Sequence, residues 1–172
     1  MHDLSFSVAD ILGRPGESRD ITILHPVSGV QTALARLSEA PVKGDLVAES
    51  VVEGILVSGR MGGVADLTCA RCLKGFSSEI EVEVCELYAA PGHLEDADED
   101  VYAVSGTEIE LEPMLRDALT LALPLNPVHD EACRGLCPRC GTDLNISSCD
   151  CTDDEIDPRW EPLSALRRKL EG

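Results

Sequence analysis

The eight cysteines are the residues whose spacing most clearly predicts chemistry in this sequence, and five of them fall within 19 residues. There, the segment Cys137-Pro-Arg-Cys140-Gly has the composition of a zinc knuckle. Two intervening residues let both sulfurs face one ion at about 2.3 Å. Cys149 and Cys151 follow after eight residues and complete a tetrahedral set of thiolates. We therefore predict a structural zinc site formed by Cys137, Cys140, Cys149 and Cys151.

A second pair, Cys69 and Cys72, lies far away in the sequence and needs two further ligands. His129 and Cys133 are the natural candidates, and such a site would tie the sheet to the C-terminal segment. Two alternatives are open: Cys69 and Cys72 could be a redox pair, or Cys133 could belong to the other cluster. Cys85 is expected to be a free or buried thiol. The sequence thus predicts one or two zinc ions.

Neither cluster predicts catalysis. A catalytic zinc keeps a position open for water and usually has mixed ligands, whereas four thiolates close the site. The four histidines are scattered, and the sequence has no phosphate-binding glycine loop and no nucleophile elbow. We expect no enzyme activity and no small-molecule substrate.

Most of the chain that precedes these cysteines is predicted to form strands. Glutamates alternate with apolar residues from Phe76 to Tyr88, which is typical of a half-buried antiparallel strand with an exposed acidic face. Before it, the stretch Asp45 to Arg60, a turn at Met61-Gly62-Gly63 and the stretch Val64 to Thr68 predict a hairpin that leads into the first cysteine pair. Apolar periodicity predicts a helix over residues 112–123.

These elements predict an α+β fold: a mostly antiparallel β-sheet domain with one or two helices and a cysteine-rich, zinc-binding C-terminal segment. Residues 1–128 form the β-rich core with an acidic loop at 92–104, and residues 129–157 form the cysteine-rich segment. Residues 158–172 have apolar residues at helical spacing beside basic ones, which predicts a short basic amphipathic helix. All three parts are expected to form one compact unit.

The net charge of −18 is concentrated in one part of the chain. Residues 79–157 hold 21 acidic and three basic residues. Such a surface disfavours free nucleic acid, because phosphates attract Lys and Arg, and aromatic residues at 3 % are too few for base-stacking platforms. No apolar run approaches the roughly 20 residues that span a bilayer, and no apolar signal core starts the chain. We therefore expect a cytoplasmic protein with no membrane partner, in which metal binding is favoured over disulfides.

Three motifs occur together in chain order: Leu67-Thr-Cys69-Ala-Arg-Cys72-Leu73, Leu121-Ala-Leu-Pro-Leu-Asn-Pro-Val-His129 and Gly135-Leu-Cys137-Pro-Arg-Cys140-Gly-Thr-Asp-Leu-Asn145. With the basic end of the chain, they resemble the bacterial YceD family, the large ribosomal RNA subunit accumulation proteins. The resemblance covers nearly the whole chain. It implies that His129 stands where many relatives have another cysteine, which keeps a zinc ligand. It also implies that the second cluster, which some relatives lack, staples the C-terminal loop locally.

The function implied by the resemblance is a non-enzymatic ribosome biogenesis factor that supports accumulation of large-subunit (23S) ribosomal RNA. The negative charge further predicts a basic partner. The acidic strand face and the 95–100 loop would shield a basic ribosomal protein, or would hold a large-subunit precursor by binding its proteins. One alternative is a direct RNA-binding factor, with contacts from Arg71, Lys74, Arg167, Arg168 and Lys169. Another is a zinc- or redox-responsive protein that uses Cys69 and Cys72.

Overall fold

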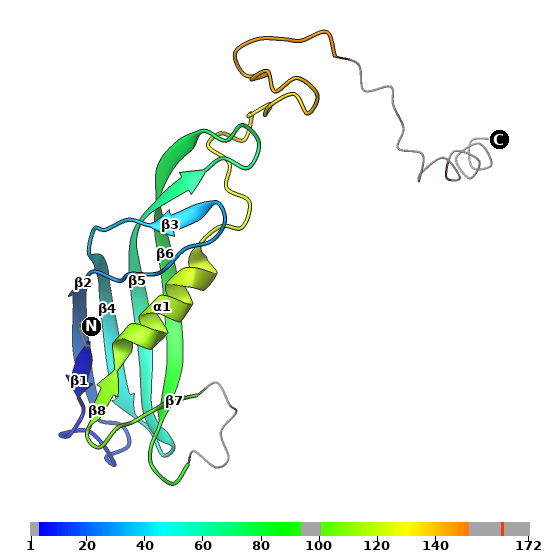
Figure 1. Cartoon of the computed structure of the whole chain (residues 1–172). Coiled ribbons are helices and arrows are strands. Elements are labelled where there is room, and N and C mark those ends of the chain that lie inside the picture. The colour runs from blue at the N-terminus through cyan, green and yellow to red at the C-terminus, as the bar shows by residue number, and fades with distance from the viewer. Residues whose placement is uncertain (1–3, 94–100, 152–162, 164–172) are drawn as a thin grey trace.

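A computed structural model describes residues 4–93, 101–151 and 163 of the chain, and its main element is a twisted sheet of six strands (Figure 1). The order is β2-β4-β5-β6-β7, and β3 pairs with the part of β5 beyond β4. All pairs are antiparallel except that of β6 with the short β7. The strands are β2 (Ser18–His25), β3 (Ala35–Leu37), β4 (Val42–Ser50), β5 (Gly54–Thr68), β6 (Gly75–Ala89) and β7 (Tyr102–Ala103).

One face of this sheet is covered by the helix α1 (Leu111–Ala122), which follows a two-stranded sheet of β1 (Ser5–Ser7) and β8 (Glu108–Glu110) (Figure 1). The helix buries Leu111, Met114, Leu115 and Leu119 against the apolar residues of the strands. Its bounds lie within one residue of the predicted helix at 112–123. The predicted α+β class, mostly antiparallel sheet with one helix, is confirmed.

The predicted turn at Met61-Gly62-Gly63 is wrong, because β5 runs through these residues without interruption. The chain instead reverses between β4 and β5 at residues 51–53. Gly62 is needed for a close approach of two backbones: a Cβ atom there would lie 2.4 Å from the carbonyl oxygen of Ile80 on β6. A glycine inside a strand pattern can mark such an approach as well as a turn.

The long β5–β6 hairpin positions the first cysteine pair. Its 15-residue strands pair in register from Gly54 opposite Ala89 to Thr68 opposite Gly75, so residues 69–74 form its tip. On β6 the predicted alternation is confirmed, with Glu79, Glu81 and Glu83 exposed. The hairpin therefore presents Cys69 and Cys72 at the far end of the sheet.

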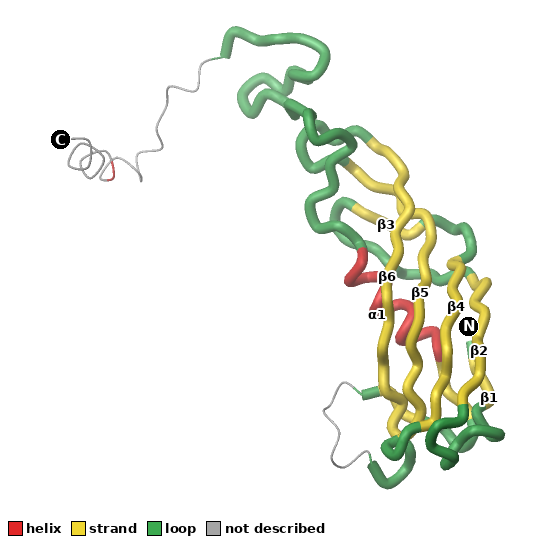
Figure 2. Tube along the Cα trace, turned by 180° about the vertical axis from the view of Figure 1, so that it is seen from behind, coloured by secondary structure: helices red, strands yellow, loops and turns green. Residues whose placement is uncertain are grey.

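The face of the sheet opposite α1 is uncovered by any element in the described part of the chain (Figure 2). The cysteine-rich residues from 129 onward form loops that extend past the hairpin tip (Figure 1). In the predicted acidic loop at 92–104, residues 102–103 belong to β7, and the acidic run lies outside the described residues. The predicted terminal helix also lies outside them, apart from Leu163. Within the described ranges, no helix combines the length and apolar character needed to cross a bilayer.

Candidate metal centres

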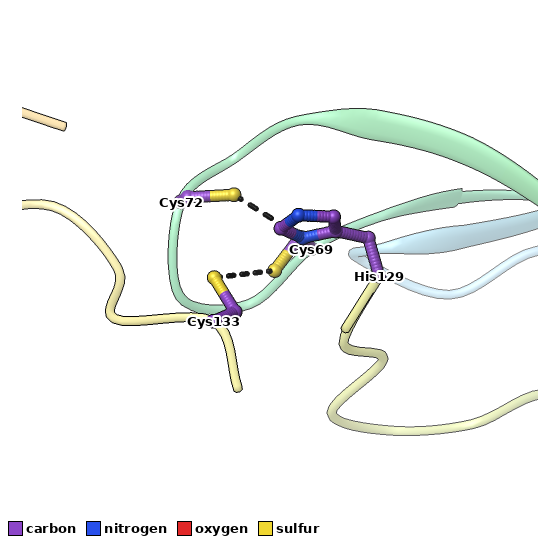
Figure 3. A group of neighbouring side chains, drawn as sticks. All are labelled: Cys69, Cys72, His129 and Cys133. Carbon is purple, nitrogen blue, oxygen red and sulfur yellow. Dashed lines mark hydrogen bonds between the residues drawn. The ribbon is translucent and has the colours of Figure 1, made fainter. Parts of the chain in front are cut away.

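The first candidate centre, site 1, consists of Cys69, Cys72, His129 and Cys133 (Figure 3). The two cysteines of the hairpin tip meet the histidine and the cysteine from the loop after α1, and all four side chains point toward one another. Their potential ligand atoms all lie within 4.8 Å of one another. The three cysteines are buried, with 0 % of Cys69 and 6 % of Cys133 exposed. Sequence and structure therefore bring the same four residues together.

The distances in site 1 fit a tetrahedral zinc site. Zinc bonds of about 2.3 Å to sulfur and about 2.0 Å to nitrogen place two sulfurs about 3.8 Å apart, and a sulfur and a nitrogen about 3.5 Å apart. The sulfurs of Cys69 and Cys133 lie 3.9 Å apart, and the Cys72 sulfur lies 3.5 Å from Nδ1 of His129. These residues could hold a zinc ion without rearrangement of the backbone.

The hairpin tip is fixed to the C-terminal loop by several hydrogen bonds. The Ala70 N–H donates to the carbonyl of Pro127, and the Leu136 N–H donates to the carbonyl of Arg71. The guanidinium of Arg71 also donates to the carbonyls of Glu131, at 3.0 Å, and Cys133, at 2.9 Å. These bonds hold the two halves of site 1 together independently of any ion.

The thiols of site 1 differ in proton affinity. The neighbouring His129 side chain lowers the pKa of Cys69 to about 5, although burial opposes the shift. The pKa of Cys72 is raised: the Lys74 backbone lowers it, but burial and the neighbouring Cys69 and Cys133 thiols together outweigh this effect. Thiolates packed this closely repel one another, and a divalent cation removes that repulsion.

The second candidate centre, site 2, consists of Cys137, Cys140, Cys149 and Cys151, whose sulfurs also lie within 4.8 Å of one another. Only Cys137 is buried, whereas Cys140 and Cys151 are exposed. The hydroxyl of Thr142, 3.1 Å from the Cys140 sulfur, is the largest cause that lowers the pKa of Cys140 to about 6. The Cys140 and Cys137 thiols raise the pKa of Cys151 to about 12. This donor set, four thiols from one loop, fits a structural zinc ion.

The two centres are built on the same turn. In site 1 the Cys69 N–H donates to the carbonyl of Lys74, and the Leu73 N–H donates to the carbonyl of Cys69. In site 2 the Cys137 N–H donates to Thr142, and the Gly141 N–H donates to Cys137.

The residue after the second cysteine is left-handed in both turns. Gly141 has φ of 73°, and Leu73 has φ of 60°. A non-glycine residue in this region is strained, so site 1 contains a strained position that site 2 avoids.

Asn145 connects the two centres and was missed by the sequence analysis. Its amide nitrogen donates to the Cys133 sulfur at 3.5 Å and to Asp143, and its side-chain oxygen accepts the Arg134 N–H at 2.7 Å. An Asn two residues after an Asp, just beyond a knuckle, is the signal that could have identified it, because such pairs fold back on the local backbone. Asn145 therefore orients one ligand of site 1 from the site 2 loop.

The other residues singled out in the sequence lie at the hairpin tip, on β6 and outside the described residues. Arg71 bonds the C-terminal loop, and Lys74 is exposed beside it at the hairpin tip. Cys85 is a free thiol that is exposed on β6 rather than buried. Arg167, Arg168 and Lys169 lie outside the described residues.

Comparison with known proteins identifies a family. A family model described as "Large ribosomal RNA subunit accumulation protein YceD" matches residues 57–167, a range that includes both candidate centres. The chain is 33 % identical to an uncharacterized protein of Mycobacterium tuberculosis over 165 residues, which cover 93 % of this chain and 79 % of the relative. An uncharacterized protein of Mycobacterium leprae is 36 % identical over 131 residues, 74 % of this chain and 59 % of the relative.

One relative with a descriptive name is a plant protein. The chloroplastic large ribosomal RNA subunit accumulation protein YCED homolog 1 of Arabidopsis thaliana is 36 % identical over 64 residues. These residues cover 37 % of this chain and 20 % of the plant protein. No solved structure matches the chain.

Proposed function

This chain belongs to the YceD family of large ribosomal RNA subunit accumulation proteins, and from that premise we propose that it is a non-enzymatic factor in large-subunit assembly. It supports the accumulation of 23S ribosomal RNA by holding a basic ribosomal protein, alone or on a precursor particle, until that protein meets RNA. We expect this factor to act in the cytoplasm. The observation that carries the proposed partner is the open, acidic face of the sheet.

The charges on this face favour a basic protein over RNA. Glu79, Glu81 and Glu83 form a row along β6, and in the described part of the chain only Glu83 of these three has an ion pair, with Arg60. Phosphate groups would be repelled by such a row, whereas Lys and Arg side chains would be attracted to it. The face therefore suits a ribosomal protein that must be kept from premature contacts with RNA.

Both centres hold zinc in this proposal, and each zinc is structural. Site 1 joins the β5–β6 hairpin to the loop after α1, and site 2 closes the loop at residues 137–151. A bound zinc supplies four strong ligand bonds that fix these loops. The support is the fit of the donor sets, which leave no ligand position for water.

Capture of the partner tests the function directly. Affinity-tagged full-length protein is purified from its host, with and without ribonuclease, at low and raised ionic strength. We expect ribosomal proteins to remain bound after ribonuclease and to be lost as salt rises, because screening weakens exposed charge contacts. Loss of all capture with ribonuclease at low salt would instead establish direct RNA binding and overturn the proposed partner.

Ribosomal RNA levels test the role in the cell. We expect a strain that lacks the gene to accumulate less large-subunit than small-subunit RNA, and the wild-type gene to restore the ratio. A variant with Glu79, Glu81 and Glu83 replaced by Gln should restore it less well. Full restoration by this variant would separate the role in RNA accumulation from the acidic face.

A further inference from the structure

One edge of β6 is free over most of its length. β5 pairs with β6 along all 15 residues on one side. On the other side, the described residues that pair with it are Tyr102 and Ala103 of β7, opposite Tyr88 and Ala89. In the described part of the chain, the edge from Gly75 to Leu87 therefore has no strand partner. Such an edge presents backbone N–H and C=O groups to any strand placed alongside it.

A groove lies beneath this edge, between β6, α1 and residues 101–102, and both apolar and acidic side chains line it. It has a volume of about 670 Å³. Val82 and Val84 of β6 line it together with Met114, Ala118 and Leu121 of α1. Leu121 is 87 % exposed and Ala118 is half-buried, so these side chains lack a covering partner among the described residues. The groove can accept apolar side chains from a neighbouring strand.

Acidic side chains border the edge on both sides of the sheet. Glu79, Glu81 and Glu83 lie on the open face, and Glu86 and Asp117 lie at the rim of the groove. A strand beside β6 would place alternate side chains in the groove and on the open face. A second copy of this chain, paired edge to edge through β6, would bring glutamates opposite glutamates, which is unfavourable. The charge pattern therefore selects a basic strand.

We propose that β6 binds its partner by strand addition. The occupant is an extended segment of a basic protein in which Lys or Arg residues alternate with apolar ones. Its backbone pairs with the free edge of β6, its apolar side chains enter the groove, and its basic side chains meet the glutamates of the open face. This inference rests on the proposed function, because it names the segment by which the basic ribosomal protein is held.

A peptide titration tests the binding mode. The probe is a fluorescent peptide of about ten residues in which Lys alternates with Val, titrated with the full-length protein at low salt. The control peptide has the same charges, but Pro replaces Val at two central positions and removes backbone N–H donors. We expect the control to bind at least about tenfold more weakly. Equal affinity would show that charge alone holds the peptide and would overturn strand addition.

Variants of the protein locate the peptide. Replacement of Glu79, Glu81 and Glu86 by Gln should weaken binding about tenfold. The matched control, with Glu17, Glu39 and Glu53 replaced by Gln, removes the same charge elsewhere and should change affinity less than about twofold. Ala118→Phe, which fills the groove, should weaken binding of the alternating peptide about tenfold while sheet circular dichroism is unchanged. Equal losses in both glutamate variants, or unchanged affinity in Ala118→Phe, would place the peptide elsewhere and overturn the proposal.

The chain's own basic C-terminal residues are a competing occupant. If the wild-type protein binds no peptide, but a variant with Arg167, Arg168 and Lys169 replaced by Glu does, the groove is filled by the chain itself and the proposal is wrong. Failure of the proposed function is a separate result: the alternating peptide would bind as expected, but no ribosomal protein would be captured after ribonuclease treatment. If ribosomal proteins are captured but both peptides bind equally well, the proposed function is supported and strand addition is refuted.

Discussion

Site 1 and site 2 use the same turn in different surroundings. In both, the first cysteine closes the turn with two backbone hydrogen bonds, and the residue after the second cysteine is left-handed. The turn of site 1 is the tip of the long β5–β6 hairpin, and its remaining ligands come from residues about 60 positions away. All four ligands of site 2 come from one loop of 15 residues.

The difference in sequence separation decides what an ion bound at each site would do. An ion that joins distant segments stabilises the whole fold, because its ligands come together only when the chain has folded. An ion that closes a short loop restricts that loop alone. Burial follows the same division, since three site 1 cysteines are buried while two site 2 cysteines are exposed. Local geometry is therefore a poor guide to the energetic role of a metal site.

Loss of a site 1 cysteine should destabilise the fold more than loss of a site 2 cysteine. Cys69→Ser should remove one zinc ion and lower the free energy of unfolding by about 4 kcal/mol, the contribution of an ion present at about 1,000 times its Kd. Cys140→Ser should remove one ion and lower it by less than about 1 kcal/mol. Native mass spectrometry counts the ions, and urea unfolding followed by sheet circular dichroism gives the stability.

The same experiment tests which cysteines share an ion. Cys133→Ser should release the same ion as Cys69→Ser, and Cys137→Ser the same ion as Cys140→Ser. The assignment of Cys133 to site 1 is wrong if the Cys133 and Cys137 variants prove to lose a shared ion. Equal losses of stability for the two sites would refute the division into a global and a local centre.

The next effect concerns Arg71 and its counterpart Arg139, which occupy the same position in the two turns. Arg71→Ala removes two hydrogen bonds to the C-terminal loop and should lower the free energy of unfolding by about 1–2 kcal/mol. It should also weaken zinc binding at site 1 about tenfold, because the bonded carbonyl of Cys133 belongs to a ligand. Arg139→Ala is the matched control and should leave site 1 unchanged. Chelator competition measures the affinity, and equal effects of the two substitutions would contradict the structural role of Arg71.

The Cys-x-x-Cys pair of each candidate site could be recognised because cysteine spacing is a local signal, whereas His129 and Cys133 were assigned to site 1 only as the remaining candidates. Two residues between thiols suffice to identify a knuckle, whatever the surrounding fold. The helix α1 and the strand β6 were predicted for a related reason, since each repeats its apolar residues with a clear period. Local features of this kind can be predicted without knowledge of the tertiary structure.

Features that depend on tertiary contacts were missed. Gly62 indicates a turn by sequence, but it permits close packing of β5 on β6. Arg71 suggests an RNA contact by its charge, yet its guanidinium bonds two carbonyls about 60 residues away. The sequence contains no sign that Leu73 must be left-handed, because neighbouring residues do not reveal the turn closed around it.

Exchange of the left-handed residues should produce smaller effects of different kinds. Leu73→Gly relieves a strain of about 1–2 kcal/mol but adds freedom to the unfolded chain. We expect the free energy of unfolding to rise by about 0.5 kcal/mol, because Leu73 is 62 % exposed and loses little packing.

The reverse substitution, Gly141→Leu, introduces the same strain into site 2. It should weaken zinc binding there about fivefold or more, while global stability is unchanged. A loss of global stability in Gly141→Leu would show that site 2 is coupled to the sheet after all.

The smallest expected effect is on one thiol of site 2 and does not involve stability. The Thr142 hydroxyl is the largest cause that lowers the pKa of Cys140 to about 6, so Thr142→Val should raise that pKa toward its ordinary value. After brief chelation that removes only the site 2 ion, Cys140 is alkylated with iodoacetamide across a series of pH values and quantified by peptide mass spectrometry. The midpoint should move to higher pH, and the rate at neutral pH should fall, because the thiolate is the reacting form. Thr142→Ser keeps the hydroxyl and should retain the wild-type midpoint. Since Cys140 is exposed, the unfolding transition should be the same in all three proteins, and a shifted transition would mean that this turn, like that of site 1, supports the fold.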